Sequence, residues 1–297
     1  MKKFAFPILG FTMLSCTVVI AQPPEAGIVV PGASPEKVAD GFTFTEGVAS
    51  DAGGQVYFSD IPASRIHFYD NAGHGKIFLE NSNRANGLHV DQHGNIIACE
   101  GAEGGRLVQI SSQGMVTVVA DGYDGKSFNS PNDLWESPNG GYYMTDPRYG
   151  SRDNLPQDGE HVYYIRGDRE KVVRVIDDMV RPNGVTGTED GSILYVADQG
   201  ADKTYRYSIL QDGTLTGKQL FADEGSDGMT LDSQGNVYLT NSAVKVYNPA
   251  GRLIETIEVP ESPTNVSFGG KDGKTLYITA RTSVYKLGMS VGKVFSN

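Results

Sequence analysis

The sequence predicts an all-β protein, a six-bladed β-propeller with four-stranded antiparallel blades around a central channel. The first observation is a short segment that recurs six times, starting at Glu46, Asn86, Asn132, Asn183, Asp227 and Asn265. Successive starts lie 40, 46, 51, 44 and 38 residues apart, which is the period of propeller blades. The second observation is that no amphipathic helical pattern separates the copies, while 37 glycines and 14 prolines mark many turns.

Each copy predicts two strands joined by a turn, and two further strands follow it. In the second copy the first strand is Gly87–Val90, the turn is Asp91–Gly94, and the second strand is the apolar run Ile96–Cys99. Third strands are predicted at Arg65–Tyr69, Arg106–Ile110, His161–Ile165, Thr204–Tyr207, Val244–Tyr247 and Ser283–Leu287. Fourth strands show a weaker pattern and are predicted at Gly75–Leu79, Met115–Val119, Lys171–Ile176, Lys218–Phe221 and Leu253–Ile257.

The two ends of the chain are predicted to meet in one blade. The sixth copy lacks a clear fourth strand before Asn297, and a ring needs that strand to close. Residues 27–42, which precede the first copy, are predicted to supply it. Because the repeats are evenly spread, residues 22–297 are expected to form a single propeller domain.

Residues 1–21 are predicted to be an export signal. Two lysines precede the apolar stretch Phe4–Ile20, and Val19-Ile20-Ala21 offers a small-residue cleavage site. A proline and several polar residues interrupt the stretch, which argues against a permanent membrane anchor. The mature chain is therefore expected to be periplasmic or secreted, without membrane insertion. A lipoprotein anchor at Cys16 is the alternative.

Charge excludes some classes of partner. Removal of the signal takes its two lysines and changes the net charge from −11 to −13. So acidic a protein repels nucleic acid and anionic lipid and gives no steering toward an anionic substrate, so a neutral small molecule suits it better. The one cysteine left, Cys99, is interpreted as a buried structural thiol rather than a nucleophile.

The repeat also predicts where chemistry occurs. First strands line the channel, so the six opening residues are expected at equivalent places around its mouth. The second strand of each blade returns to the same face, where Asp60, Asp146 and Asp198 are interpreted as caps for backbone groups rather than as catalysts. The connection Pro147–Glu160 is longer than its counterparts, and it is either a lid or pocket wall or a plain surface excursion.

The first residues of the six copies, here called the openers, predict a cation site. Glu46 and Asp227 bring two carboxylates into a narrow space, where one must be protonated or a cation must neutralise both. Asn132 and Asn183 add carbonyl oxygens, and an all-oxygen donor set favours calcium or magnesium, with manganese next. Zinc usually takes His or Cys, and the five histidines show no ligand spacing.

Turn formation is the alternative explanation for the openers, because Asn or Asp before Gly, as at Asn86, Asn183 and Asp227, commonly forms turns. It is favoured for Asn86 and Asn265, but it does not explain Glu46, because Glu is a poor turn residue. No serine-hydrolase elbow, phosphate-binding glycine loop or zinc-protease motif occurs. A hydrolase built on this chain would therefore use a water molecule assisted by the metal.

Five motifs occur in a fixed order: Glu46-Gly47, Ser130-Pro131-Asn132-Asp133, Thr145-Asp146-Pro147-Arg148-Tyr149-Gly150, Pro182-Asn183-Gly184-Val185 and Ser226-Asp227-Gly228-Met229. As a set they resemble the gluconolactonase/regucalcin (senescence marker protein) family of six-bladed propellers, over roughly Gly41 to Leu287. The resemblance implies one divalent cation held by Glu46, Asn183 and Asp227, with Asn132 near both metal and substrate. Calcium is the first choice, and magnesium, manganese and zinc are alternatives.

The resemblance also implies a lactonase that acts on a small sugar lactone. In the implied mechanism the cation polarises the lactone carbonyl, Asn132 bonds to the substrate or the ion, and Asp227 acts as base toward water. A cation-activated hydroxide is the alternative base. Arg84, Asn86, Arg148 and Tyr149 are the further predicted substrate residues. Ser130 departs from the pattern, because regucalcin-like members have an Arg there for substrate, so the sugar is left open.

Two other functions are compatible with the repeat. A non-catalytic propeller that binds a ligand or a protein needs the strands but no ring of oxygens, so Glu46→Gln would leave its function intact. A calcium-binding or strictosidine-synthase-like propeller would bind metal without lactone turnover. The sequence makes no prediction of the oligomeric state.

Overall fold

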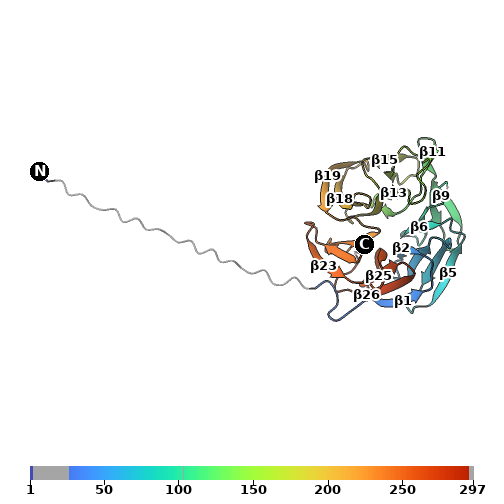
Figure 1. The fold of residues 1–297 in the computed structure, drawn as a ribbon, viewed down its shortest axis with the longest axis horizontal. Helices are drawn as coiled ribbons and strands as arrows, with labels where there is room; N and C mark the ends of the chain where they lie inside the picture. The colour runs from blue at the N-terminus through green and yellow to red at the C-terminus, as the bar shows by residue number, and fades with distance from the viewer. Residues whose placement is uncertain (3–26, 103, 294–297) are drawn as a thin grey trace.

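Six four-stranded antiparallel sheets stand in a ring in the computed structural model, which describes residues 1–2, 27–102 and 104–293 (Figure 1). The predicted six-bladed β-propeller is thereby confirmed. The described residues contain no helix, and hence none long and apolar enough to cross a membrane. Apart from its first two residues, the predicted export signal lies outside the described residues, as does Cys16.

The blades follow one another in chain order, and the first strand of each lies nearest the channel. Blades one and two contain β2 (Thr45–Ser50), β3 (Val56–Asp60), β4 (Arg65–Tyr69) and β5 (Gly75–Glu80), then β6 (Ala85–Val90), β7 (Ile96–Glu100), β8 (Arg106–Ile110) and β9 (Val116–Ala120). Blades three and four contain β12 (Leu134–Glu136), β13 (Tyr142–Asp146), β14 (His161–Ile165) and β15 (Val172–Ile176), then β16 (Pro182–Gly187), β17 (Ile193–Asp198), β18 (Lys203–Ile209) and β19 (Leu215–Ala222). Blades five and six contain β20 (Met229–Leu231), β21 (Val237–Thr240), β22 (Val244–Tyr247) and β23 (Leu253–Ile257), then β24 (Pro263–Gly269), β25 (Thr275–Ala280), β26 (Ser283–Gly288) and β1 (Glu36–Asp40).

The ring closes as predicted, through the strand that precedes the first copy. β1 pairs antiparallel with β26, with Glu36 opposite Lys286 and Asp40 opposite Ser283. Glu261 reinforces this blade, since its carboxylate accepts hydrogen bonds from the backbone N–H of Thr282 and the hydroxyl of Tyr285, both at 3.0 Å. Closure pairs the two ends of the chain and leaves the sixth blade with the same four strands as the others.

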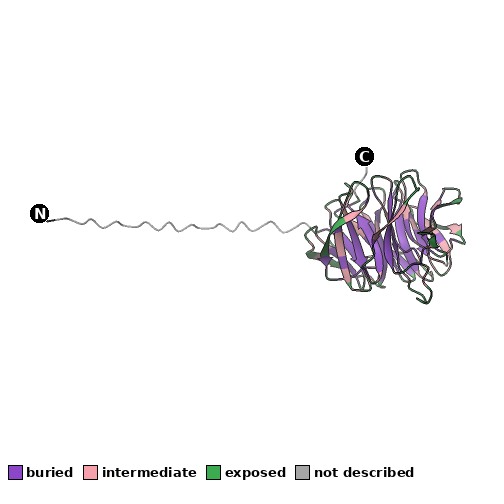
Figure 2. Ribbon diagram, turned by 90° about the horizontal axis from the view of Figure 1, so that it is seen from above, coloured by how far each residue is buried: buried purple, intermediate pink, exposed green. Residues whose placement is uncertain are grey.

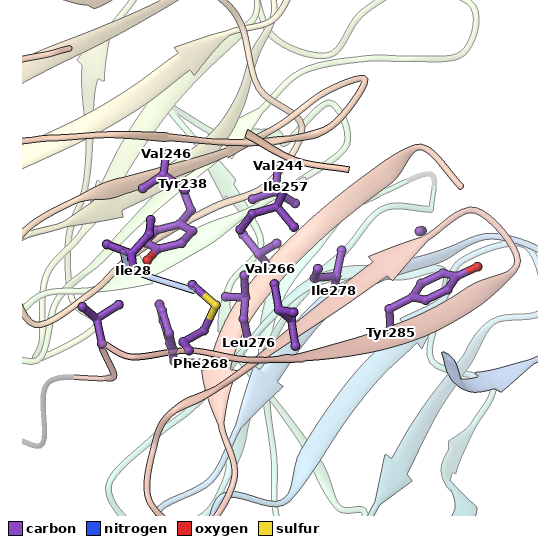
Figure 3. Packing of buried hydrophobic residues seen from close by; sticks show 14 residues of the cluster. Ile28, Tyr238, Val244, Val246, Ile257, Val266, Phe268, Leu276, Ile278 and Tyr285 are labelled. Carbon is purple, nitrogen blue, oxygen red and sulfur yellow. The ribbon is translucent and has the colours of Figure 1, made fainter. Parts of the chain in front are cut away.

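The core lies between the faces of neighbouring blades. Figure 2 shows buried strands through the body of the ring and exposed residues on the connections. Between blades five and six, Tyr238 meets Phe268 edge-on, with ring centroids 5.3 Å apart, and Val246 and Ile278 belong to the same cluster (Figure 3). Burial of each such side chain stabilises the fold by about 1.5–3 kcal/mol. The described residues contain no disulfide, so these contacts hold the blades together.

A short hairpin, β10 (Gly122–Tyr123) and β11 (Lys126–Ser127), was not predicted from the sequence. It lies between blades two and three and is tied to the long connection 147–160. The side-chain amide of Gln157 donates to the carbonyl oxygens of Tyr123, Lys126 and Ser127 at 3.2, 3.1 and 2.9 Å. The long connection is therefore anchored on the blades rather than extended from the surface.

Cys99 lies in β7 and is fully buried, as predicted. Burial raises the pKa of its thiol well above the usual value. Because the thiolate is the reactive form of cysteine, this environment makes Cys99 inert.

Candidate active site

Most of the openers lie within strands rather than in turns. β2, β6, β16 and β24 each contain an irregularity of pairing at the opener, between Glu46 and Ala49, Ala85 and Leu88, Pro182 and Val185, and Pro263 and Asn265. A β-bulge of this kind changes the direction of a side chain. The turn interpretation of Asn86 and Asn265 is therefore wrong, because both residues are part of a strand.

The glycines that follow the openers allow neighbouring inner strands to approach closely. A Cβ on Gly87 would lie 2.6 Å from the carbonyl oxygen of Asn132, and one on Gly184 would lie 2.5 Å from that of Asp227. Both distances are shorter than any real Cβ contact, so another residue would push the blades apart. Each of these glycines thus adjoins the opener of the next blade.

Three acids at the ends of second strands hold the segments that lead into the openers. Asp60 accepts hydrogen bonds from the backbone N–H groups of Thr43 and Phe44 at 3.0 and 3.1 Å. Asp146 and Asp198 likewise each accept hydrogen bonds from two backbone N–H groups, at 2.7–2.9 Å. In each case the donors lie two and three residues before the opener, Asn132 or Asn183. The interpretation of these acids as backbone caps is confirmed.

A cavity of about 1010 Å³ opens on the face where the openers lie. Seven of the predicted site residues line it: Glu46, Arg84, Asn86, Asn132, Arg148, Tyr149 and Asp227. The eighth, Asn183, is bonded to two of them. The structure therefore brings all the predicted site residues together, and Arg148, Tyr149 and Gly150 make the start of the long connection a wall of the cavity.

Glu46 belongs to the lining of this cavity and is almost fully buried, with 4% of its surface exposed. Its Oε2 accepts hydrogen bonds from the N–H of Gly47 at 2.9 Å and from the side-chain amide of Asn265 at 3.2 Å. Burial and the neighbouring charge of Asp227 raise the pKa of Glu46 well above its usual value. Asn265, which does not line the cavity, thus positions Glu46.

Asp227 lies at the centre of a second group of polar side chains. Asn183 donates its side-chain N–H to Asp227 at 2.6 Å, to the Tyr149 hydroxyl at 2.5 Å and to the Gln199 side chain at 3.3 Å. Tyr149 in turn donates to Gln199. Burial raises the pKa of Asp227, while the Asn183 bond and the charge of Arg281 act in the opposite direction.

This donor set fits a hard divalent cation. The charge of Asp227 raises the pKa of Glu46, and among the described residues neither carboxylate forms an ion pair with a basic side chain. The side-chain amides of Asn86 and Asn132 face the same cavity and make no hydrogen bond within the described part of the chain. Oxygen donors with uncompensated negative charge are what calcium and magnesium require.

The remaining ligands would be amides and water rather than further acids. No group of three or more His, Cys, Asp or Glu side chains suited to a metal occurs in the ranges that the structure describes. Asn183 presents its nitrogen to Asp227, so its oxygen would become a ligand only after a half-turn of the amide. Such a half-turn is a small change, since an amide has nearly the same shape in both orientations.

Three residues of this site were missed in the sequence. Asp133 is buried beside Asn132 and accepts hydrogen bonds from the N–H of Leu134 at 2.9 Å and of Val185 at 3.4 Å; burial raises its pKa to about 7. The sequence feature that could have identified Asp133 is its position directly after the opener Asn132. Gln199 and Arg281 lie in connections between strands and carry no pattern that marks them.

Comparison with known proteins gives a consistent result. The family model described as the SMP-30/Gluconolactonase/LRE-like region matches residues 44–282. A gluconolactonase of Zymomonas mobilis is 28% identical, over 85% of this chain and 80% of that protein. A pentonolactonase of Haloferax volcanii is 27% identical, over 76% of this chain and 77% of that protein.

A solved structure shares the architecture as well. The gluconolactonase of Xanthomonas campestris superposes with a TM-score of 0.82 at 25% identity, covering 88% of this chain and 91% of that one. Residues 44–282, which the family model matches, include every blade that contributes an opener to the cavity.

Proposed function

Because this chain belongs to the SMP-30/gluconolactonase/LRE-like family, we propose that it is a hydrolase that opens a sugar lactone with the help of one divalent cation. Curated relatives over most of its length are named gluconolactonase and pentonolactonase, which supports a lactone as the substrate class. The observation that carries the proposal is the position of Glu46 and Asp227 in one cavity, where a buried and a partly buried carboxylate of like charge favour a bound cation.

Glu46, Asp227 and Asn183 would hold the cation, and Asn132 lies close enough in the cavity to complete the set. When bound, a divalent cation supplies positive charge to the lactone carbonyl oxygen and to the anion that develops on it. The backbone caps at Asp60, Asp146 and Asp198 keep the openers in place, so the donor set is organised before substrate arrives.

The residues of this chain provide the proton transfers and the orientation of substrate. Asp227 accepts a proton from the water that attacks the lactone carbonyl carbon. The bond between that carbon and the ring oxygen then breaks, and the ring oxygen takes the proton, which leaves an open-chain hydroxy acid. The free amide of Asn132 and the Tyr149 hydroxyl face the same space and orient the sugar hydroxyls.

Acid release from lactones tests this proposal. The purified protein, supplied with calcium, magnesium or manganese, is assayed on glucono-1,5-lactone, a pentono-1,4-lactone and an aromatic lactone, and spontaneous hydrolysis is subtracted. Turnover of at least one sugar lactone is the expected result. Binding of a divalent cation without turnover of any lactone would contradict the proposal and favour a propeller that only binds ligands.

Export is the remaining part of the proposal. It rests on residues 1–21, whose basic start and apolar stretch have the character of a signal. The N-terminal sequence of protein recovered from the periplasm or the medium is expected to begin at Gln22. Export would be contradicted if all of the protein were found in the cytoplasm with its N-terminal Met1 still present.

A further inference from the structure

The wall of the cavity is more positive than the protein around it. Among the described residues, three arginines line the cavity, Arg84, Arg148 and Arg281, and two acids, Glu46 and Asp227. The whole chain carries a net charge of −11. The overall negative charge argues for a neutral substrate. A ligand inside the cavity, however, interacts mainly with the charged side chains that line it, because low-dielectric walls concentrate their electric field in the cleft.

The three guanidinium groups are not paired by short contacts in the described part of the chain, although the charge of Arg148 acts on Asp146 and that of Arg281 acts on Asp227. Among the described residues none of them forms an ion pair or a side-chain hydrogen bond, and Arg148 Nε is buried without any partner. Arg281 lies over the ring of Phe44, at 5.8 Å from its centroid. Arginines away from the cavity behave differently, and those that pair with a carboxylate include Arg65, Arg106, Arg152 and Arg174.

Arg148 Nε is a buried polar atom without a partner, and it needs an explanation because burial removes its water. Arg84 and Arg281 are exposed, so their donors are open to water or to a ligand. A guanidinium offers a flat fork of donors that matches the oxygens of a carboxylate or a phosphate. Three such forks around one cavity therefore leave donors available to a ligand that brings oxyanion acceptors.

The positions of the arginines support this explanation. Each comes from a different connection: Arg84 precedes β6, Arg148 begins the long connection after β13, and Arg281 lies in the hairpin between β25 and β26. Arg84 and Arg281 adopt left-handed backbone conformations, with φ of 56° and 50°. Such conformations are unfavourable for a residue with a long side chain, and outside the cavity Arg169 has one as well.

We propose that the substrate is a lactone that carries a negatively charged carboxylate or phosphate group, bound by Arg84, Arg148 and Arg281. This inference rests on the proposed lactonase function and adds the chemical class of the substrate. The carboxylates of Glu46 and Asp227 lie where the lactone carbonyl is expected, and the arginines lie around the rest of the same cavity.

The test compares three lactones: neutral glucono-1,5-lactone, 6-phosphoglucono-1,5-lactone and glucaro-1,4-lactone, which carries a carboxylate. We expect kcat/KM for one of the charged lactones to exceed that for the neutral one about tenfold or more. The preferred charged lactone identifies the group as phosphate or carboxylate. Rising salt is expected to reduce this preference, because it screens the arginines.

Arg281→Gln removes one guanidinium and keeps a side chain of similar length. Its ratio of kcat/KM, charged over neutral lactone, is expected to fall about tenfold. Arg169→Gln is the matched control, since Arg169 has a similar backbone conformation, with φ of 63°, and bonds to Gln109 outside the cavity. The ratio is expected to stay the same in the control. Equal kcat/KM for all three lactones, with no change of the ratio in Arg281→Gln, would overturn the inference.

Binding of the open-chain acids separates this inference from the proposed function. Calorimetry is used to compare 6-phosphogluconate, glucarate and gluconate in wild type, Arg281→Gln and Arg169→Gln. Tighter binding of an acid with a second anionic group, 6-phosphogluconate or glucarate, lost in Arg281→Gln alone, supports the anion subsite even if no lactone is hydrolysed. Equal binding of all three acids by all three proteins contradicts the subsite, whether or not lactones are hydrolysed.

Discussion

The side-chain amide of Asn183 donates a 2.6 Å hydrogen bond to Asp227 Oδ1, across the boundary between the fourth and fifth blades. Asn265 makes an equivalent bond to Glu46 across the boundary between the sixth and first blades, at 3.2 Å. The site is thus a network of residues from successive inner strands. Its geometry depends on how closely the blades approach, and on the closure that places β24 beside β2.

Replacement of Glu46 by Gln is expected to abolish cation binding and to lower kcat/KM by about 100-fold or more, because one of the two carboxylates loses its charge while its shape is kept. Stopped-flow proton release with a saturating divalent ion measures the effect. Glu189→Gln, an exposed change of the same chemistry, is the control and is expected to behave as wild type. Unchanged turnover in Glu46→Gln would remove Glu46 from the mechanism.

Replacement of Tyr149 by Phe is expected to lower kcat/KM about tenfold, which corresponds to the loss of roughly one hydrogen bond. The hydroxyl of Tyr149 bonds to both Asn183 and Gln199, so its removal loosens the amide beside Asp227. Steady-state kinetics measure the change. Tyr205→Phe, on the outer part of the fourth blade, serves as control, and an equal loss there would show that the effect is not local.

Replacement of Gly87 by Ala is expected to destabilise the protein by about 1–3 kcal/mol, because the added methyl group would meet backbone atoms of Asn132 and Asp133. Thermal unfolding followed by circular dichroism measures the shift. Gly150→Ala is the control for stability, since a Cβ there has no atom within 4 Å. An equal and small change in both variants would show that the inner strands tolerate a wider separation.

Acid is expected to weaken the blade that closes the ring, through Glu261. Burial alone would raise the pKa of Glu261, but hydrogen bonds from Ser283, Thr282 and Tyr285 outweigh it and lower the pKa to about 2. The ionised form therefore stabilises the folded state. This stabilisation is complete above the pKa of Glu in the unfolded chain, about 4.3, and is lost as pH falls from there toward 2.

The measurement is the melting temperature of wild type and Glu261→Gln between pH 7 and pH 3. The two proteins are expected to differ most at pH 7 and to converge as the pH falls below about 4. Glu258→Gln, an exposed change three residues away, is expected to match wild type throughout. A gap that widens in acid would contradict the assignment.

The repeat made the architecture predictable, because each copy carries its own turn and apolar strand, and closure then needed only one further strand. The connections were less predictable. The hairpin β10–β11 is short and polar, and it forms because Gln157, about 30 residues away in the sequence, satisfies its carbonyl oxygens. No local pattern predicts a contact of that separation.

The openers could be identified because they recur, whereas their partners do not. Asn265 was assigned to a turn because Asn commonly forms turns, but its amide bonds to a carboxylate of the first blade. Gln199 and Arg281 lie in connections from the second to the third strand of their blades, and both line the cavity. The overall charge likewise gave no indication of the three arginines that gather there.

The central claim is that a cation held at Glu46 and Asp227 supports lactone hydrolysis, and a joint titration tests it most directly. Metal-free protein is titrated with calcium or magnesium, and both the heat of binding and the rate of acid release from a sugar lactone are recorded at each point. The account predicts that the rate rises in proportion to occupancy of one site in wild type, and that Glu46→Gln shows neither signal. Full hydrolysis in the chelated protein, unaffected by added metal, would contradict it.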